Sequence, residues 1–154
     1  DSVCDIGGAW GGALTEAEKD GRKGPFLLVE SCAQLVQETL RKDLYEIIQM
    51  ECGTMSAPDT WHKIPKPDES YDTVIMGDML EHNHCVQSIY TMADGIRLAK
   101  KRVLITTPNA EWIDRQPFCC MAGHMTFYTP EIFRRILDGV ESIRYWFQEA
   151  PPEW

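Results

Sequence analysis

The sequence has no long apolar run and no segment typical of exported proteins. None of its apolar stretches approaches the roughly 20 residues that a membrane-spanning helix requires. The chain also does not open with a basic segment followed by an apolar one, as a secretory leader does. We therefore expect no membrane partner for this chain.

Cysteine pairs at metal-binding or redox spacing are missing as well. The six cysteines include no Cys-x-x-Cys pair, and a chain with 44% hydrophobic residues has enough apolar core to fold without a disulfide framework. We therefore expect reduced thiols and a cytoplasmic protein. The cysteines are Cys4, Cys32, Cys52, Cys85, Cys119 and Cys120.

Basic residues are scarce. The chain carries 15 of them against 24 acidic residues, for a formal net charge of −9. Proteins that bind nucleic acid usually present a basic patch, because the neutralisation of phosphates supplies most of their affinity. The basic cluster Lys100, Lys101 and Arg102 lies at a predicted helix–strand junction, where positive charge complements the helix dipole. Nucleic acid is therefore disfavoured as a partner or substrate.

Strand and helix patterns alternate along the chain. FLLVE at 26–30 is a continuous apolar run that follows Gly24-Pro25, as expected of a strand buried on both faces. A helix pattern over 84–99 places four apolar residues on one stripe, as in an amphipathic helix. These four are Val86, Ile89, Ala93 and Ile96. Strands are predicted over 2–6, 26–30, 45–52, 71–77 and 102–106, and helices over 10–20, 31–42 and 84–99.

The helix over 31–42 is expected to begin with Ser31 as its cap. Another helix is predicted to begin at Thr129, which is a natural cap, with Pro130 in the first helical position. Its inward side chains would be Ile132, Ile136 and Leu137. Residues 55–70 contain three prolines and are predicted to be loop-like, whereas 142–148 also fit a strand.

This alternation predicts one α/β domain over residues 1–154. Repeated strand–helix–strand units form a mostly parallel sheet with right-handed crossovers, so the expected fold is a three-layer Rossmann-like sandwich. The opening residues SVCDIGG already have the character of a buried strand. Truncation at the N-terminus, with loss of a helix that often precedes such a strand, is therefore one interpretation of the sequence.

A glycine-rich turn follows the first predicted strand. In DIGGAWGG at 5–12, glycines allow the backbone to approach a ligand closely and direct helix N-terminal amides at it. Glu30 ends the second strand and lies near the sequence offset at which a carboxylate meets a ribose diol. A tight turn with nothing bound is the alternative interpretation of the turn alone.

A second group of polar residues follows the fourth predicted strand. Asp78, Glu81 and His82 lie at the carboxyl edge of the sheet, where open α/β folds bind ligands, and His124 follows the fifth strand toward the same edge. Two carboxylates and two imidazoles are suitable ligands for a divalent ion.

Five segments in order resemble the class I S-adenosylmethionine-dependent methyltransferases. They are DIGGAWGG, VES, IPKPDESYDTVIMGDMLEH, RVLITTPN and GHMTFYTPEIFRRIL, and they extend over most of the chain. The resemblance implies that S-adenosylmethionine is the cofactor, with its ribose held by Glu30. The cofactor-binding residues that it implies are Asp5, Gly7, Gly8, Ala9, Gly11, Glu30, Ser31, Thr54, Met55, Gly77, Asp78 and Met79.

The sequence departs from the family pattern at two positions. Ala9 replaces the middle glycine of the family's GxGxG, which places a methyl group where the backbone approaches the methionine part of the cofactor. After the third strand the family often has an acid that faces the adenine amine, whereas Thr54 offers a hydroxyl here. A hydroxyl accepts from that amine more weakly than a carboxylate does.

The histidines have two interpretations. Acid-x-x-Glu-His with a distant His is similar to the metal-binding pattern of small-RNA 3′-terminal 2′-O-methyltransferases, and its first part also resembles ubiquinone-biosynthesis O-methyltransferases. This similarity implies that Mg²⁺ or another divalent ion binds at Asp78, Glu81, His82 and His124. Leu-Glu-His endings are also common in metal-free relatives, where the His packs beside the cofactor. His82 or His124 is also a candidate general base.

The function that the resemblance implies is methyl transfer to an oxygen of a small or sugar-like acceptor, with nitrogen as the second choice of acceptor atom. Two alternatives remain: a degenerate, non-catalytic nucleoside-binding or interaction module, and a nicotinamide-dependent dehydrogenase. A homo-oligomer, in which a second chain covers the sheet edge, is a further expectation.

Trp61 and His62 are candidates to line the adenine, with a packing role as the alternative for Trp61. Cys119 and Cys120 fall in 114–124, where a lid over the acceptor would lie.

Overall fold

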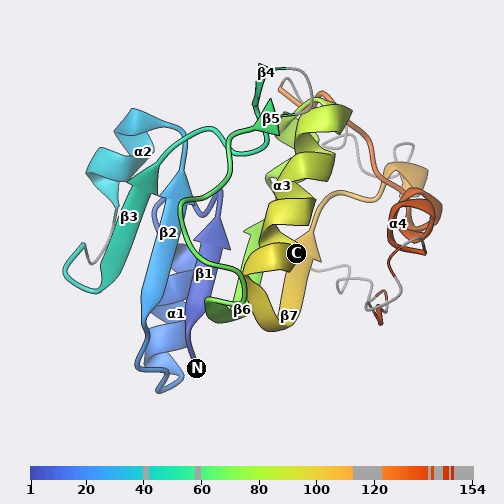
Figure 1. Ribbon diagram of the computed structural model, residues 1–154. Coiled ribbons are helices and arrows are strands. Elements are labelled where there is room, and N and C mark those ends of the chain that lie inside the picture. Colours follow the sequence, from blue (N-terminus) through green and yellow to red (C-terminus); the bar gives the residue numbers. More distant parts are fainter. Residues whose placement is uncertain are drawn as a thin grey trace.

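A five-stranded, wholly parallel sheet forms the centre of the molecule (Figure 1). The computed structural model describes residues 1–39, 42–57, 60–112, 123–138, 140, 144, 145 and 147, without the side chains of 55–57, 60, 61 and 112. The strand order is β3-β2-β1-β6-β7. The strands are β1 (Val3–Ile6), β2 (Phe26–Glu30), β3 (Tyr45–Gln49), β6 (Tyr71–Gly77) and β7 (Ala99–Thr106). The predicted α/β class with a parallel sheet is confirmed.

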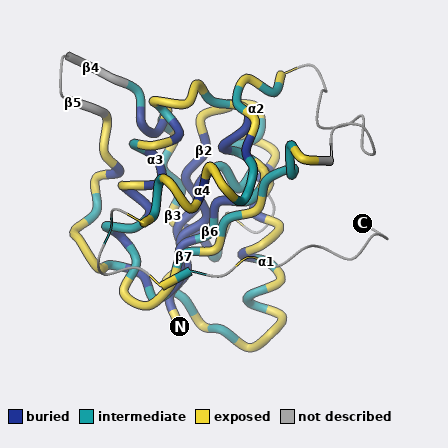
Figure 2. Tube along the Cα trace, turned by 90° about the vertical axis from the view of Figure 1, so that its right-hand side faces the viewer, coloured by how far each residue is buried: buried dark blue, intermediate teal, exposed yellow. Residues whose placement is uncertain are grey.

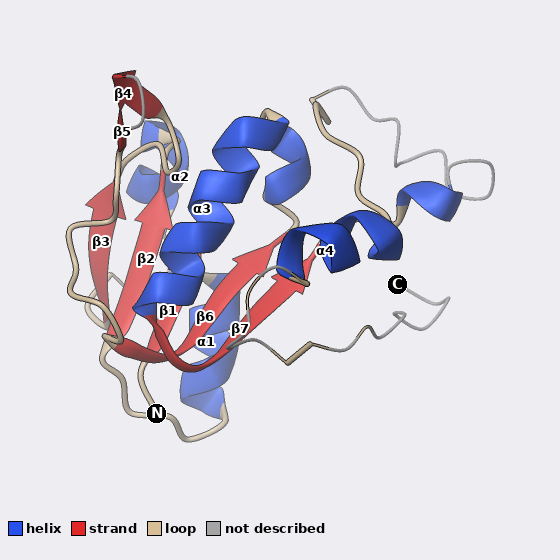
Figure 3. Ribbon diagram, turned by 45° about the vertical axis from the view of Figure 1, so that its right-hand side comes forward, coloured by secondary structure: helices blue, strands red, loops and turns tan. Residues whose placement is uncertain are grey.

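Helices lie on both faces of this sheet. Helix α1 is behind the strands and α3 is in front of them in Figure 3, so that the three layers of the predicted sandwich are present. The helices are α1 (Gly12–Lys19), α2 (Ala33–Glu38), α3 (Cys85–Leu98) and α4 (Pro130–Leu137), with short 3-10 turns η1 (Leu80–His82) and η2 (Ala110–Trp112). Among the described residues, no helix is long and apolar enough to cross a membrane.

Alternating side chains of the central strands supply two hydrophobic clusters, one on each face. Cys4 and Ile6 of β1 and Leu27 of β2 belong to the cluster that contains Leu98 of α3. Their neighbours on the other face belong to the cluster around Leu14 of α1. This arrangement explains why FLLVE is a continuous apolar run, since a parallel strand must be apolar toward both helical layers. The buried residues form the centre of the tube in Figure 2.

The stripe of four apolar residues on α3 does not form the packing face of that helix. Val86 and Ile89 are 52% and 46% exposed. The buried face instead consists largely of small or polar residues, with Gly95 so close to β6 that a Cβ there would lie 2.8 Å from the Met76 side chain. Asp94 on this face accepts a hydrogen bond from the Ile64 backbone N–H at 2.6 Å. Close approach and satisfied polar groups, rather than apolar periodicity, therefore determine how α3 packs.

Several predicted boundaries also differ from the structure. Within 55–70, where only loop was expected, β4 (Met55–Ala57) and β5 (Thr60–Trp61) form an antiparallel pair. Helix α2 is shorter than predicted, and its N-cap is Cys32 rather than Ser31. In α4, Phe133 is the buried residue and Ile132 is exposed, although Thr129 caps the helix as predicted, accepting from the Ile132 N–H. The region predicted as a strand at 142–148 lies largely outside the described residues, and so do Cys119 and Cys120.

Candidate functional site

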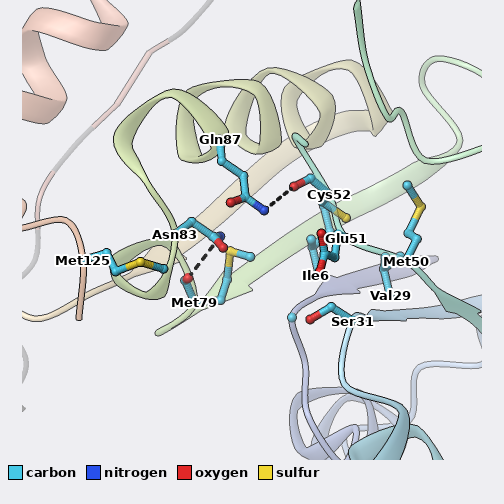
Figure 4. Close-up of a pocket in the computed structure, with 11 residues that line it drawn as sticks. Ile6, Val29, Ser31, Met50, Glu51, Cys52, Met79, Asn83, Gln87 and Met125 are labelled. Atoms are coloured by element: carbon cyan, nitrogen blue, oxygen red, sulfur yellow. Dashed lines mark hydrogen bonds between the residues drawn. The ribbon is translucent and has the colours of Figure 1, made fainter. Parts of the chain in front are cut away.

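Two cavities open at the carboxyl edge of the sheet, and both are lined by Gly7. The first has a volume of about 230 Å³ and lies between the ends of β1, β2 and β3 and the start of α3 (Figure 4). Its lining residues are Ile6, Gly7, Val29, Ser31, Met50, Glu51, Cys52, Met79, Asn83, Gln87 and Met125. The second has a volume of about 330 Å³ and is lined by Asp5, Gly7, Gly8, Ala9, Trp10, Gly12, Ala13, Ile75, Gly77 and Asp78.

Glu30 connects the turn after β1 to the start of α2. Its side chain is buried, and its carboxylate accepts hydrogen bonds from the Ala9 N–H at 3.0 Å and the Cys32 N–H at 2.9 Å. The Ser31 hydroxyl also donates to it, at 3.4 Å. A carboxylate has about four lone-pair sites, so these bonds leave acceptor capacity for a ligand hydroxyl. The ribose role of Glu30 stays a prediction, and the structure adds a second role in fixing the turn.

Asp5 is a buried carboxyl group at the other side of the same turn. It is 2% exposed, and burial, with a smaller contribution from the nearby Glu30 carboxylate, raises its pKa to about 7. A Cβ at Gly8 would collide with this carboxyl group, so glycine is required there. Asp5 therefore lines the second cavity as a group that changes charge near neutral pH.

Ala9 and Asp78, which both line the second cavity, have left-handed backbone conformations. Their φ angles are 48° and 45°, in a region that L-residues other than glycine seldom adopt. Ala9 therefore holds a conformation that glycine adopts readily and that costs other L-residues about 1–2 kcal/mol. The Asp78 backbone N–H is held by Thr106, through its carbonyl oxygen at 2.9 Å and its hydroxyl at 3.2 Å. Such strained positions are concentrated at functional sites.

Three potential ligand side chains come together next to η1. One ligand atom from each of Glu81, His82 and His124 lies within 4.8 Å of the others. The structure does not bring Asp78, the fourth predicted ligand, into this group, because its left-handed backbone places it at the second cavity. Each backbone N–H of Met125 and Thr126 donates to the Glu81 carbonyl, which ties the His124 segment to η1.

Hydrogen bonds orient two members of this cluster. Nδ1 of His82 lies 3.1 Å from the Gly123 carbonyl, which can only accept, so Nδ1 carries the proton and Nε2 of the neutral ring is a lone-pair donor. Glu81 is 3% exposed and accepts from the Thr107 hydroxyl at 3.0 Å. Burial raises the pKa of Glu81. The cluster therefore offers a buried carboxyl group and an oriented imidazole, suited to accept a proton or bind a cation.

The structure distributes the other predicted cofactor residues unevenly. Gly7, Ser31 and Met79 line the first cavity, whereas Asp5, Gly7, Gly8, Ala9, Gly77 and Asp78 line the second. Gly11, Glu30 and Thr54 line neither, and the side chain of Met55 lies outside the described residues. Gly11 is the left-handed N-cap of α1, where a Cβ would lie 2.7 Å from the Tyr45 ring. The exposed His62 also lines neither cavity, and the side chain of Trp61 lies outside the described residues.

Sequence reasoning missed three polar side chains of the first cavity, namely Glu51, Asn83 and Gln87. Glu51 had a usable signal, because it is an acid two residues beyond β3, close to where the family often places one. Asn83 and Gln87 follow η1 and begin α3, and no spacing in the sequence distinguishes them from solvent-exposed helix residues.

Comparison with known proteins identifies this fold. No family model matches the sequence, and no curated protein matches it. Among solved structures, the chain resembles an S-adenosylmethionine (SAM)-dependent methyltransferase from Aquifex aeolicus (19% identity, TM-score 0.65, 91% of this chain and 71% of that one). It also resembles one from Archaeoglobus fulgidus (16% identity, TM-score 0.68, 91% of this chain and 60% of that one).

A third similar structure is the Haloferax volcanii chain that was solved in complex with the methyltransferase activator Trm112 (16% identity, TM-score 0.67, 90% of this chain and 60% of that one). The present chain thus spans 60% of the length of the Haloferax and Archaeoglobus chains. These similarities show that it has the Rossmann-like fold of the SAM-dependent methyltransferases.

Proposed function

We propose that this chain is the S-adenosylmethionine-binding core of a methyltransferase. The observation that carries the proposal is that two cavities meet at Gly7, at the carboxyl edge of a sheet with the methyltransferase fold. The adenosyl group occupies the first cavity and the methionine part occupies the second, with the ribose near Glu30. A single elongated ligand then fills both cavities. A tight glycine-rich turn that binds nothing would not require a cavity on either side of it.

The charges in the second cavity suit the methionine part. Asp5 and Asp78 provide carboxyl groups for its ammonium group and for the nearby sulfonium charge. Gly12 and Ala13 begin α1, whose N-cap Gly11 supplies no side-chain hydrogen bond, so their backbone amides are available to the ligand carboxylate. The same cavity therefore accommodates both charges of an amino-acid end.

The reaction is an in-line displacement at the sulfonium methyl. The acceptor oxygen forms a bond to the methyl carbon, the carbon–sulfur bond breaks, and its electron pair stays on sulfur as S-adenosylhomocysteine is released. Because the sulfonium is already a good leaving group, the protein contributes mainly position and exclusion of water. We assign the acceptor's proton to Nε2 of His82 or to His124, at the edge between β6 and β7. The acceptor is proposed to be a small or sugar-like hydroxyl compound.

As an alternative to a histidine base, we propose that Glu81, His82 and His124 hold a divalent ion. Both imidazoles would then be ligands, and the ion would acidify the acceptor hydroxyl so that its proton leaves to water. The donor set fits, because Thr107 orients the buried carboxylate and Gly123 fixes the imidazole of His82. Two imidazoles and one carboxylate favour Mn²⁺, Co²⁺ or Zn²⁺ over Mg²⁺.

Replacement of His124 by alanine is therefore expected to weaken Mn²⁺ binding by roughly 100-fold, because one of three protein ligands is lost. The measurement is calorimetric titration with Mn²⁺ alone. His84→Ala, a variant of an exposed histidine outside the cluster, is the matched control and should bind as the wild type does. Equal affinities for wild type and His124→Ala would show that the cluster is not a metal site.

The structure contains one observation that favours a non-catalytic nucleoside-binding module. The methyl group of Ala9 lies in the lining of the second cavity, where the family pattern has only backbone. A module of this kind would bind a nucleoside ligand weakly and would not transfer a methyl group.

The proposal is tested by thermal unfolding with ligands present. At 100 times its dissociation constant, a ligand that binds only the folded state stabilises it by about 2.7 kcal/mol. For a chain of this size, that stabilisation raises Tm by roughly 5–10 °C. We expect this shift with S-adenosylhomocysteine and none with NAD⁺. A shift with NAD⁺ alone would contradict the proposal and favour a dehydrogenase.

A further inference from the structure

Gln87, in the first turn of α3, has a side-chain amide that is fixed against the chain segment after β3. Its Nε2 donates to the Cys52 carbonyl oxygen at 3.0 Å, and it lies 3.4 Å from the Thr54 hydroxyl (Figure 4 shows the first of these bonds). The amide therefore connects the two walls of the first cavity.

These partners determine which end of the amide faces the cavity. The Cys52 carbonyl oxygen can only accept a hydrogen bond, so the nitrogen of Gln87 must face it. The Thr54 hydroxyl uses its own proton toward Glu51, at 3.4 Å, and therefore also accepts from Gln87. Both contacts require the same orientation. Figure 4 accordingly shows the oxygen Oε1 of Gln87 turned away from Cys52, toward the side of Asn83.

We propose that Gln87 is the residue that selects a 6-amino purine over a 6-oxo purine in the first cavity. This inference rests on the proposed function, because it takes the adenosyl group to be the occupant. Met50 and Met79 provide polarizable apolar surfaces for the purine faces. Oε1 of Gln87 then accepts from the adenine amine. A 6-oxo purine would instead place its carbonyl oxygen against Oε1, and the resulting pair of acceptors would leave both without a donor.

Glu51 lines the same cavity but is less suited to this selection. Its carboxylate is exposed, whereas Gln87 is half-buried and held by two contacts. Water can satisfy an exposed carboxylate when the ligand lacks an amine, so little affinity is lost there. An oriented, partly buried acceptor has no such substitute, which is why sites that hydrogen-bond one substrate group discriminate strongly.

The test compares S-adenosyl-L-homocysteine with S-inosyl-L-homocysteine, which differ only at the purine 6-position and in the N1 proton. By calorimetric titration, the wild type is expected to bind the adenosyl compound roughly 10- to 100-fold more tightly. Gln87→Met retains the length of the side chain but not the acceptor, and is expected to reduce this ratio to about threefold or less. Gln37→Met, at an exposed position on α2, is the matched control and should retain the wild-type ratio.

Each outcome has a distinct meaning. Equal affinity of the wild type for the two compounds would overturn the assignment of Gln87 while leaving the proposed function intact. Failure of folded wild type to bind either compound would instead overturn the proposed function. An unchanged ratio in Gln87→Met would also overturn the assignment. If Gln87→Met does not fold, Gln87→Ala, which also removes the acceptor, is measured in its place, and an unchanged ratio in it would likewise overturn the assignment.

Discussion

Asp5→Asn is expected to stabilise the folded protein at pH 8 and, at the same time, to weaken its binding of S-adenosylhomocysteine. Burial and the Glu30 carboxylate raise the pKa of Asp5 to about 7, so ionisation of this group opposes folding. Replacement by a neutral amide removes that charge. The expected gain in unfolding free energy at pH 8 is roughly 1–3 kcal/mol, on the basis of about 1.4 kcal/mol per pKa unit with allowance for the altered hydrogen bonds.

The pH dependence has a definite sign. Because the folded-state pKa of about 7 lies above the unfolded value of 3.8, the folded protein binds more protons than the unfolded chain between about pH 4 and pH 7. The contribution of Asp5 to stability is therefore fully present below pH 4 and is lost as the pH rises through 7. Binding has the opposite dependence, because the ligand ammonium group interacts with the ionised form. Affinity for S-adenosylhomocysteine should rise several-fold between pH 6 and pH 7.5.

Urea denaturation at pH 5 and pH 8, with parallel calorimetric titrations, measures both effects. The difference in unfolding free energy between wild type and Asp5→Asn isolates this group from the other acids. Asp20→Asn, at the exposed C-cap of α1, is the control and should show neither effect. Equal pH dependence in wild type and Asp5→Asn would show that Asp5 is not the group responsible.

Glu30→Gln is expected to reduce the affinity for S-adenosylhomocysteine by roughly 100-fold or more. The wild-type carboxylate accepts from two backbone amides, of Ala9 and Cys32, on different oxygens. A glutamine has one oxygen, so its NH₂ group must face one of those N–H donors and leave it unsatisfied, at a cost of about 1–3 kcal/mol. Either the turn that lines both cavities or the start of α2 then loses its bond to this side chain, and the ribose loses one acceptor.

A double-mutant cycle separates the two roles of Glu30. Affinities of wild type and Glu30→Gln are measured for S-adenosylhomocysteine and for its 2′-deoxy analogue. If the carboxylate binds the ribose, removal of the 2′-hydroxyl weakens wild type but has little further effect on the variant. Glu16→Gln, at an exposed position on α1 outside both cavities, is the control. An affinity of Glu30→Gln within threefold of wild type would contradict both roles.

The fold was predictable from sequence because its signals are local. The continuous apolar run at 26–30 and the strand at 71–77 coincide with β2 and β6. Strands that are buried on both faces leave an unambiguous pattern, and glycines mark the turn after β1. Helix α3 shows where this reasoning fails, because its close approach through Gly95 and its bond from Asp94 depend on partners distant in sequence. The apolar stripe was then mistaken for the packing face.

The site was predictable only in part, for the same reason. Residues at or just after the carboxyl ends of strands, such as Asp5 in β1 and Asp78 after β6, were found because topology alone brings them to one edge. Which of these edge residues come together depends on backbone conformation, which the sequence does not reveal. Asp78, with its left-handed φ, lines the second cavity and does not join the cluster of Glu81, His82 and His124. Gln87 was missed because its role depends on the Cys52 carbonyl, a backbone group that has no signature in the sequence.

The most direct test of the central claim is calorimetric titration of the wild-type protein with S-adenosylmethionine. The proposed site predicts saturable binding of one ligand per chain with micromolar affinity, despite the methyl group of Ala9. It also predicts that Glu30→Ala, shown by circular dichroism to be folded, binds much more weakly. Absence of binding heat over a range of temperatures, from wild-type protein shown to be folded, would contradict the claim that these two cavities form a cofactor site.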